Sequence, residues 1–138
     1  MEPRRTRSRA PAALPYDPRV DPLDLHAGLA RAILLYLAAL GAWGLLLAAR
    51  GSGPSPSYRG ALVVVEVAIL AQGLLGALAW PSHGPADWIH VLYGLALALA
   101  LPLAATLVRE GSPRRTALFL GTASLFAAGL AIRGMSTA

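Results

Sequence analysis

Four long apolar stretches, separated by short polar ones, dominate the chain after residue 25. They cover residues 27–49, 60–80, 86–108 and 116–132. A helix that crosses a hydrocarbon core of about 30 Å needs roughly 20 apolar residues. The pattern therefore predicts four transmembrane helices, with the last stretch near the lower limit of length for a crossing.

Residues 95–101 alternate strictly between Leu and Ala, a pattern that is also typical of a β-strand. A strand edge in lipid would leave backbone N–H and C=O groups unpaired, and four strands are too few to close a barrel. We therefore expect a helix here as well.

The connections between the apolar stretches are about ten, five and seven residues long. Connections this short require consecutive helices to run antiparallel. The sequence thus predicts an all-α integral membrane protein whose residues 26–138 form one domain, an up-down four-transmembrane-helix bundle. Small residues at a spacing of four, which favours close helix contacts in lipid, mark three candidate contact faces: Gly73 with Ala77, Gly94 with Ala98, and Ala117 with Gly121.

Residues 1–25 contain five Pro, five Arg and four acidic residues without apolar periodicity. Such a composition buries too little apolar surface to offset the entropy lost on ordering. We expect an extended or disordered tail that orders on the surface of a partner. The apolar stretch that follows is longer than the core of a signal peptide, so it should remain as a membrane anchor.

Composition and charge support a membrane location. Of the 138 residues 56% are hydrophobic and only 14% are charged, which is too apolar for an ordinary soluble domain. The net charge of +5 comes from arginines in the tail and at the ends of the apolar stretches, where they can face lipid headgroups, so nucleic-acid binding is not expected. The chain has no Cys, which excludes disulfides, Cys metal sites and thiol catalysis. Arginines on both sides leave the orientation open.

Two histidines are candidate cofactor ligands. His26 begins the first predicted span and His90 lies just inside the third, and these spans run in the same direction. Two facing imidazoles are the axial ligands that a b-type haem needs. Arg31 and Tyr93 would then be candidate contacts of the haem propionates. The alternative is that the histidines are interfacial polar residues, with His90 bonded to a backbone carbonyl.

A zinc site could in principle combine His83, Asp87 and His90, since Asp87 and His90 are three residues apart. Asp87 is better placed to cap the third helix at its N-terminus. No metal site is therefore expected.

Glu66 is an acidic residue within the second apolar stretch, VVVEVAIL. A charged carboxylate at that depth costs a few kcal/mol, so the side chain should face the bundle interior. One hypothesis makes Glu66 the proton site of a proton-coupled oligomeric transporter. The other makes it a protonated residue that hydrogen-bonds a neighbouring helix or a partner subunit.

Hydrolase or transferase sites, phosphate-binding loops and carboxylate pairs are absent from the sequence, which indicates a protein that is not an enzyme. The leading interpretation is a small non-catalytic subunit or assembly partner of a larger membrane complex, such as an electron-transfer complex. Its partners would be the lipid bilayer and other membrane subunits, in the membrane of a bacterial cell. A b-haem electron carrier and a transporter built on Glu66 are the alternatives.

Overall fold

The computed structural model describes residues 21–108 and 111–138, and within these ranges it contains helices and no strands. The helices are α1 (Pro22–Ala49), α2 (Pro56–His83), α3 (Trp88–Leu107) and α4 (Pro113–Met135). The predicted all-α fold class is confirmed, and the alternating Leu/Ala segment is helical. Residues 1–20, which make up most of the predicted tail, lie outside the described residues.

Each helix begins at a polar residue whose side chain accepts a hydrogen bond from a backbone N–H of the first turn. These residues are Asp21, Ser55, Asp87 and Ser112. In α1, α2 and α4 a proline follows at once, and its fixed φ angle and missing N–H suit the first helical position. These three helices therefore start several residues before the apolar pattern indicates.

Helix α2 also ends later than the sequence indicates. The apolar stretch ends at residue 80, but α2 continues through Pro81 to His83. A proline inside a helix removes one backbone hydrogen bond, and only two residues of α2 follow Pro81. The helix stops at Gly84, whose φ of 84° is readily accessible only to glycine.

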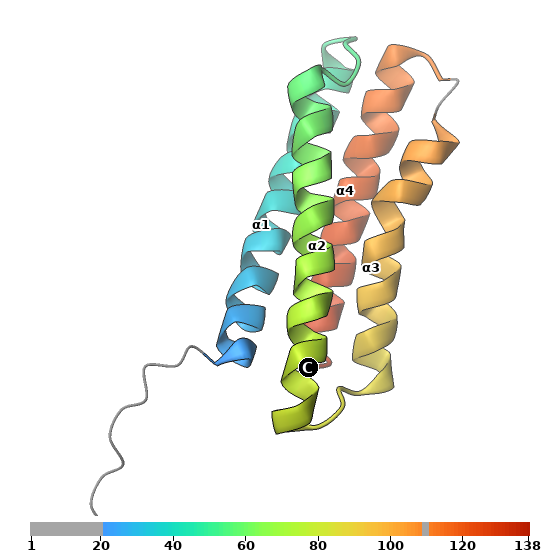
Figure 1. The fold of residues 1–138 in the computed structure, drawn as a ribbon. Helices are drawn as coiled ribbons and strands as arrows, with labels where there is room; N and C mark the ends of the chain where they lie inside the picture. Colours follow the sequence, from blue (N-terminus) through green and yellow to red (C-terminus); the bar gives the residue numbers. More distant parts are fainter. Residues whose placement is uncertain (1–20, 109–110) are drawn as a thin grey trace, which may run out of the picture.

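The four helices lie side by side (Figure 1). The α1–α2 and α3–α4 connections are at one end of the molecule, and the α2–α3 connection and the C-terminus are at the other (Figure 1). Helix α1 makes its most extensive contacts with α4, whereas α2 and α3 have the least extensive contacts of the adjacent pairs. The bundle is thus tightly packed on one side and loosely packed on the other.

Three glycines allow the backbones of α1 and α4 to touch. A Cβ atom added to Gly121 of α4 would lie 2.8 Å from the backbone N of Leu45, and one added to Gly44 of α1 would lie 2.7 Å from the Cα of Gly121. Gly41 faces the same contact. Of the three small-residue pairs marked in the sequence, only Ala117 with Gly121 lies in a close helix contact, because Gly73 and Gly94 have no atoms near the position of a Cβ.

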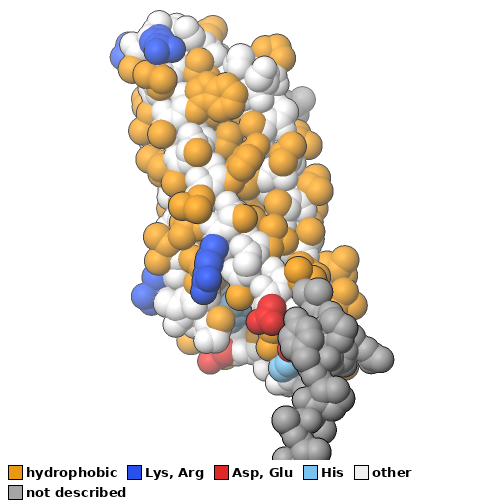
Figure 2. Space-filling model, turned by 90° about the vertical axis from the view of Figure 1, so that its left-hand side faces the viewer, with side chains coloured by type: hydrophobic (Ala, Val, Ile, Leu, Met, Phe, Trp, Pro, Cys, Tyr) orange, Lys and Arg blue, Asp and Glu red, His pale blue; other side chains and the backbone are white. Residues whose placement is uncertain are grey.

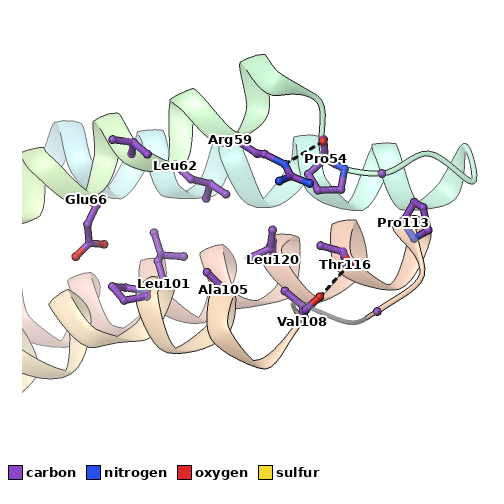
Figure 3. Close-up of a pocket in the computed structure, with 14 residues that line it drawn as sticks. Pro54, Arg59, Leu62, Glu66, Leu101, Ala105, Val108, Pro113, Thr116 and Leu120 are labelled. Carbon is purple, nitrogen blue, oxygen red and sulfur yellow. Dashed lines mark hydrogen bonds between the residues drawn. The ribbon is translucent and has the colours of Figure 1, made fainter.

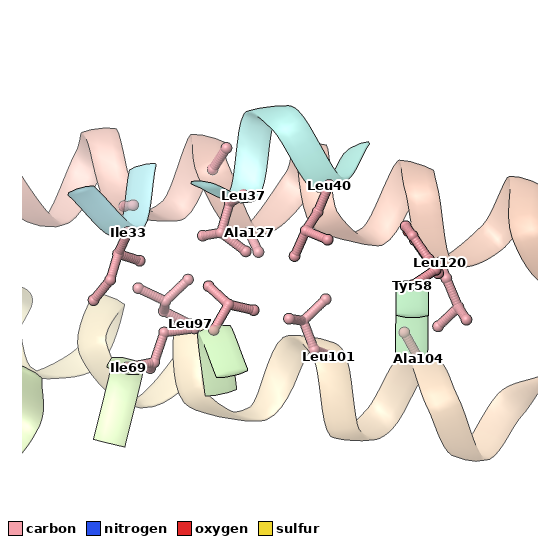
Figure 4. Close-up of a cluster of buried hydrophobic side chains, with 13 residues drawn as sticks. Ile33, Leu37, Leu40, Tyr58, Ile69, Leu97, Leu101, Ala104, Leu120 and Ala127 are labelled. Atoms are coloured by element: carbon pink, nitrogen blue, oxygen red, sulfur yellow. The ribbon is translucent and has the colours of Figure 1, made fainter. Parts of the chain in front are cut away.

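Aliphatic side chains from all four helices fill the space between them (Figure 4). Leu37 and Val65 are almost fully buried at the centre of this core. The outer surface is also apolar, with many exposed large hydrophobic residues along the sides (Figure 2). All four helices are long and apolar enough to cross a membrane.

We expect Gly121→Ala to lower the thermal stability of the purified protein, by about 1–3 kcal/mol in the free energy of unfolding, because a methyl group there meets backbone atoms. Gly129→Ala, on the same helix, adds a methyl group in open space and should be neutral or slightly stabilising. Thermal unfolding in detergent, followed by circular dichroism, measures both. Equal stability of the two variants would contradict the close contact of α1 with α4.

Candidate functional site

His26 and His90 lie next to each other at the end of the bundle that carries the α2–α3 connection. The centres of their imidazole rings are 5.9 Å apart. In the apolar pattern His90 lies deeper in its stretch than His26 does. Because α1 begins at Pro22, His26 lies more than one turn inside its helix, and the two side chains reach the same level. The structure therefore brings together the two residues that the sequence marked as candidate ligands.

Backbone carbonyls orient both imidazole rings. The Nδ1 atom of His26 lies 3.1 Å from the carbonyl oxygen of Gln72, and the Nδ1 atom of His90 lies 2.9 Å from that of Gly134. A carbonyl oxygen can only accept, so each Nδ1 carries the hydrogen. In the neutral ring Nε2 then holds the free lone pair. The hydrogen bond to a backbone carbonyl that the interfacial alternative predicts for His90 is therefore present. It uses Nδ1 and leaves the lone pair of Nε2 able to bind a metal.

Helix α2 holds His26 through two residues. The side-chain Nε2 of Gln72 donates to the backbone oxygen of His26 at 2.9 Å, so the two residues are joined by a reciprocal pair of hydrogen bonds. Gly76, one turn further along α2, leaves space for the ring, because a Cβ there would lie 3.1 Å from His26 Cε1. Neither residue was singled out from the sequence for this site. A lone glutamine in an apolar span was the available signal.

Tyr93 lies on the same side of α3 as His90 and contacts Arg133. The guanidinium carbon of Arg133 is 5.9 Å from the centre of the Tyr93 ring, a cation–π distance. Arg133 directly precedes Gly134, the residue that accepts from His90. Arg31 is exposed on α1. Arg133, and not Arg31, is therefore the arginine that contacts a residue beside His90.

His83 and Asp87, the other two residues of the possible zinc site, each contact other groups at this end of the bundle. The Nε2 atom of His83 lies 3.5 Å from a carboxylate oxygen of Asp21. Asp87 caps α3, accepting from the backbone N of Ile89 at 2.9 Å. Within residues 21–108 and 111–138, no group of three metal-binding side chains comes together.

Glu66 lies in a separate cavity nearer the opposite end of the bundle. This cavity, of about 670 Å³, is formed mainly by α2 and α3 and closed at one end by the start of α4. The Glu66 side chain extends from α2 towards α3 (Figure 3). Its Oε2 atom is buried, and it has no hydrogen-bond partner among the described residues.

No family model, curated protein or solved structure matches this chain. The function therefore has to be inferred from the residues themselves. Two oriented imidazoles without a third protein ligand suit a cofactor that brings most of its own ligands, whereas the Glu66 cavity suits a small molecule.

Gln72→Leu should lower the free energy of unfolding by on the order of 1 kcal/mol, because the backbone oxygen of His26 loses its side-chain donor. Thr122→Val is the matched control, since the exposed Thr122 hydroxyl bonds only carbonyls of its own helix. Thermal unfolding in detergent compares the two variants. If Gln72→Leu were no less stable than Thr122→Val, the reciprocal bonds would not hold α2 against α1.

Proposed function

We propose that the chain crosses a membrane as an up-down four-helix bundle and serves as a small haem-carrying subunit of a larger electron-transfer complex. His26 and His90 are the axial ligands in this proposal. The observation that carries it is the pairing of two imidazoles whose Nδ1 atoms both face backbone carbonyls.

Membrane insertion is supported by the distribution of charge on the bundle. Arg50, Arg59, Arg114 and Arg115 are at one end. At the other end Asp21 and Asp87 are the N-caps of α1 and α3, Asp24 is in the first turn of α1 and Arg133 is in the last turn of α4. The helix surfaces between them expose mainly apolar side chains (Figure 2). Charged ends and apolar sides match the headgroup and hydrocarbon layers of a bilayer.

The distance between the two ring centres supports the proposal that both imidazoles would hold one iron. With metal–nitrogen bonds of about 2 Å, two axial imidazoles place their ring centres on the order of 6 Å apart. The observed distance is 5.9 Å. A porphyrin supplies four nitrogen ligands itself, so two histidines are a sufficient protein contribution.

The surrounding residues have defined roles in this proposal. The Nδ1–H bonds to the carbonyls of Gln72 and Gly134 fix the ring orientation and make Nε2 a better donor to a metal. Arg133 and Arg31 supply positive charge for the acidic edge of the cofactor, with Tyr93 positioned against Arg133. When bound, a b-type haem supplies reversible one-electron transfer. The protein itself catalyses no reaction in this proposal.

Single cysteines test the membrane topology, because the natural chain contains none. Ser52→Cys lies in the α1–α2 connection and Ala138→Cys at the opposite end of the bundle. We expect a membrane-impermeant maleimide to label them from opposite sides of intact cells or vesicles, and permeabilised samples to label both. Labelling of both from one side of intact membranes would contradict the up-down crossing.

A reduced-minus-oxidised visible spectrum tests the cofactor. Protein purified from its native membrane should show the sharp α band of a b-type haem after reduction with dithionite. His26→Ala and His90→Ala should lose most of the bound haem, because each removes one axial ligand. His83→Ala is the matched control, since this third histidine lies 3.5 Å from Asp21, and the variant should keep the spectrum.

Two results would overturn the haem proposal. One is a featureless spectrum from intact wild-type protein. The other is an unchanged spectrum in both His26→Ala and His90→Ala, which would place the ligands elsewhere.

A further inference from the structure

The cavity at Glu66 has the size of a small-molecule site. Helices α2 and α3 make the fewest contacts of the adjacent pairs, and the space between them measures about 670 Å³. Sites for small ligands have volumes of roughly 300–1,000 Å³. Val63, which is 63% exposed, forms part of the wall, so the cavity opens at the side of the bundle.

The wall of this cavity is mainly apolar, and its polar side chains are Arg59, Glu66 and Thr116. Leu62, Leu101, Ala105 and Leu120 provide apolar surface from three helices (Figure 3). Glu66 is the acidic residue of the lining. A ligand that fits this wall therefore has an apolar body and one group that complements a carboxyl.

Arg59 does not satisfy Glu66. The two residues are seven positions apart on α2, about two turns and roughly 10 Å along the helix axis. Arg59 lies towards the α1–α2 connection, where its Nε donates to the carbonyl of Pro54 at 3.4 Å (Figure 3). Glu66 forms no ion pair within the part of the chain that the structure describes, and its Oε2 lacks a donor.

A buried carboxyl oxygen without a partner is costly, and a charge-assisted hydrogen bond is the strongest way to satisfy a carboxyl group. An ammonium group supplies both the opposite charge and the missing donor. We propose that this cavity binds a lipophilic amine, with the ammonium group on Glu66 and the apolar body between α2 and α3. The ligand enters from the side of the bundle, past Val63.

This site is independent of the histidine pair. Glu66 lies ten residues before Gly76, the α2 residue that faces the His26 ring, which is about 15 Å along the helix. Loss of amine binding should therefore leave any haem spectrum unchanged, and loss of haem should leave amine binding unchanged. Failure of one proposal is distinguishable from failure of the other.

The test is calorimetric titration of the full chain in phosphatidylcholine nanodiscs with N,N-dimethyloctylamine. Neutral 1-octanol and anionic octanoate are the ligand controls, and empty nanodiscs give the background of partition into lipid. We expect saturable binding of the amine alone. Glu66→Gln keeps the shape of the side chain and removes its charge, and it should weaken binding of the amine about tenfold or more.

Two further variants separate a specific site from a general effect. Asp24→Asn removes an exposed acid from α1 and should bind the amine like the wild type. Ala105→Leu keeps Glu66 but fills part of the cavity, and it should also weaken binding. The proposal is overturned if the wild type shows no binding above empty nanodiscs, if octanol binds as tightly as the amine, or if correctly folded Glu66→Gln and Ala105→Leu both bind like the wild type.

Discussion

The contact between the backbones of α1 and α4 determines how the rest of the molecule is arranged. The backbone of Gly121 lies directly against Gly44, and Gly41 leaves space for the side chain of Leu125 beside it. Lipid gives helices little hydrophobic reason to associate, so close packing of this kind is a main source of stability in a membrane bundle. Helices α2 and α3 then pack mainly against this pair and only weakly against each other. The dense contact on one side and the cavity on the other are two results of the same arrangement.

The two candidate sites depend on different properties of α2. Near its C-terminal end α2 is tied to α1 through Gln72 and Gly76, and this contact orients His26. In its first half it stands apart from α3 and presents Glu66 to an open space. One helix therefore both orients an imidazole and forms one wall of a cavity.

Much of the fold was predictable from the sequence, and less of the sites was. The four helices follow from apolar stretches that are too long for other structures. The first residues of the helices were predicted less accurately, because Asp21 and Ser55 cap α1 and α2 several residues before the apolar stretches begin. The pairing of His26 with His90 was one of two hypotheses, and it rested on spans that run in the same direction. The roles of Gln72, Gly76 and Gly134 could not be predicted, because they depend on the rotation of each helix about its axis, and spans that are apolar on every side carry little information about rotation.

Both imidazoles are held by main-chain oxygen atoms, at residues 72 and 134. A main-chain acceptor exists whatever side chain its residue carries, so substitutions at residue 134 can change the chemistry around His90 without removing its partner. During evolutionary divergence the orientation of the rings would be inherited with the positions of the helices. A search for related proteins should therefore weigh the spacing of the two histidines more heavily than the identities of their neighbours.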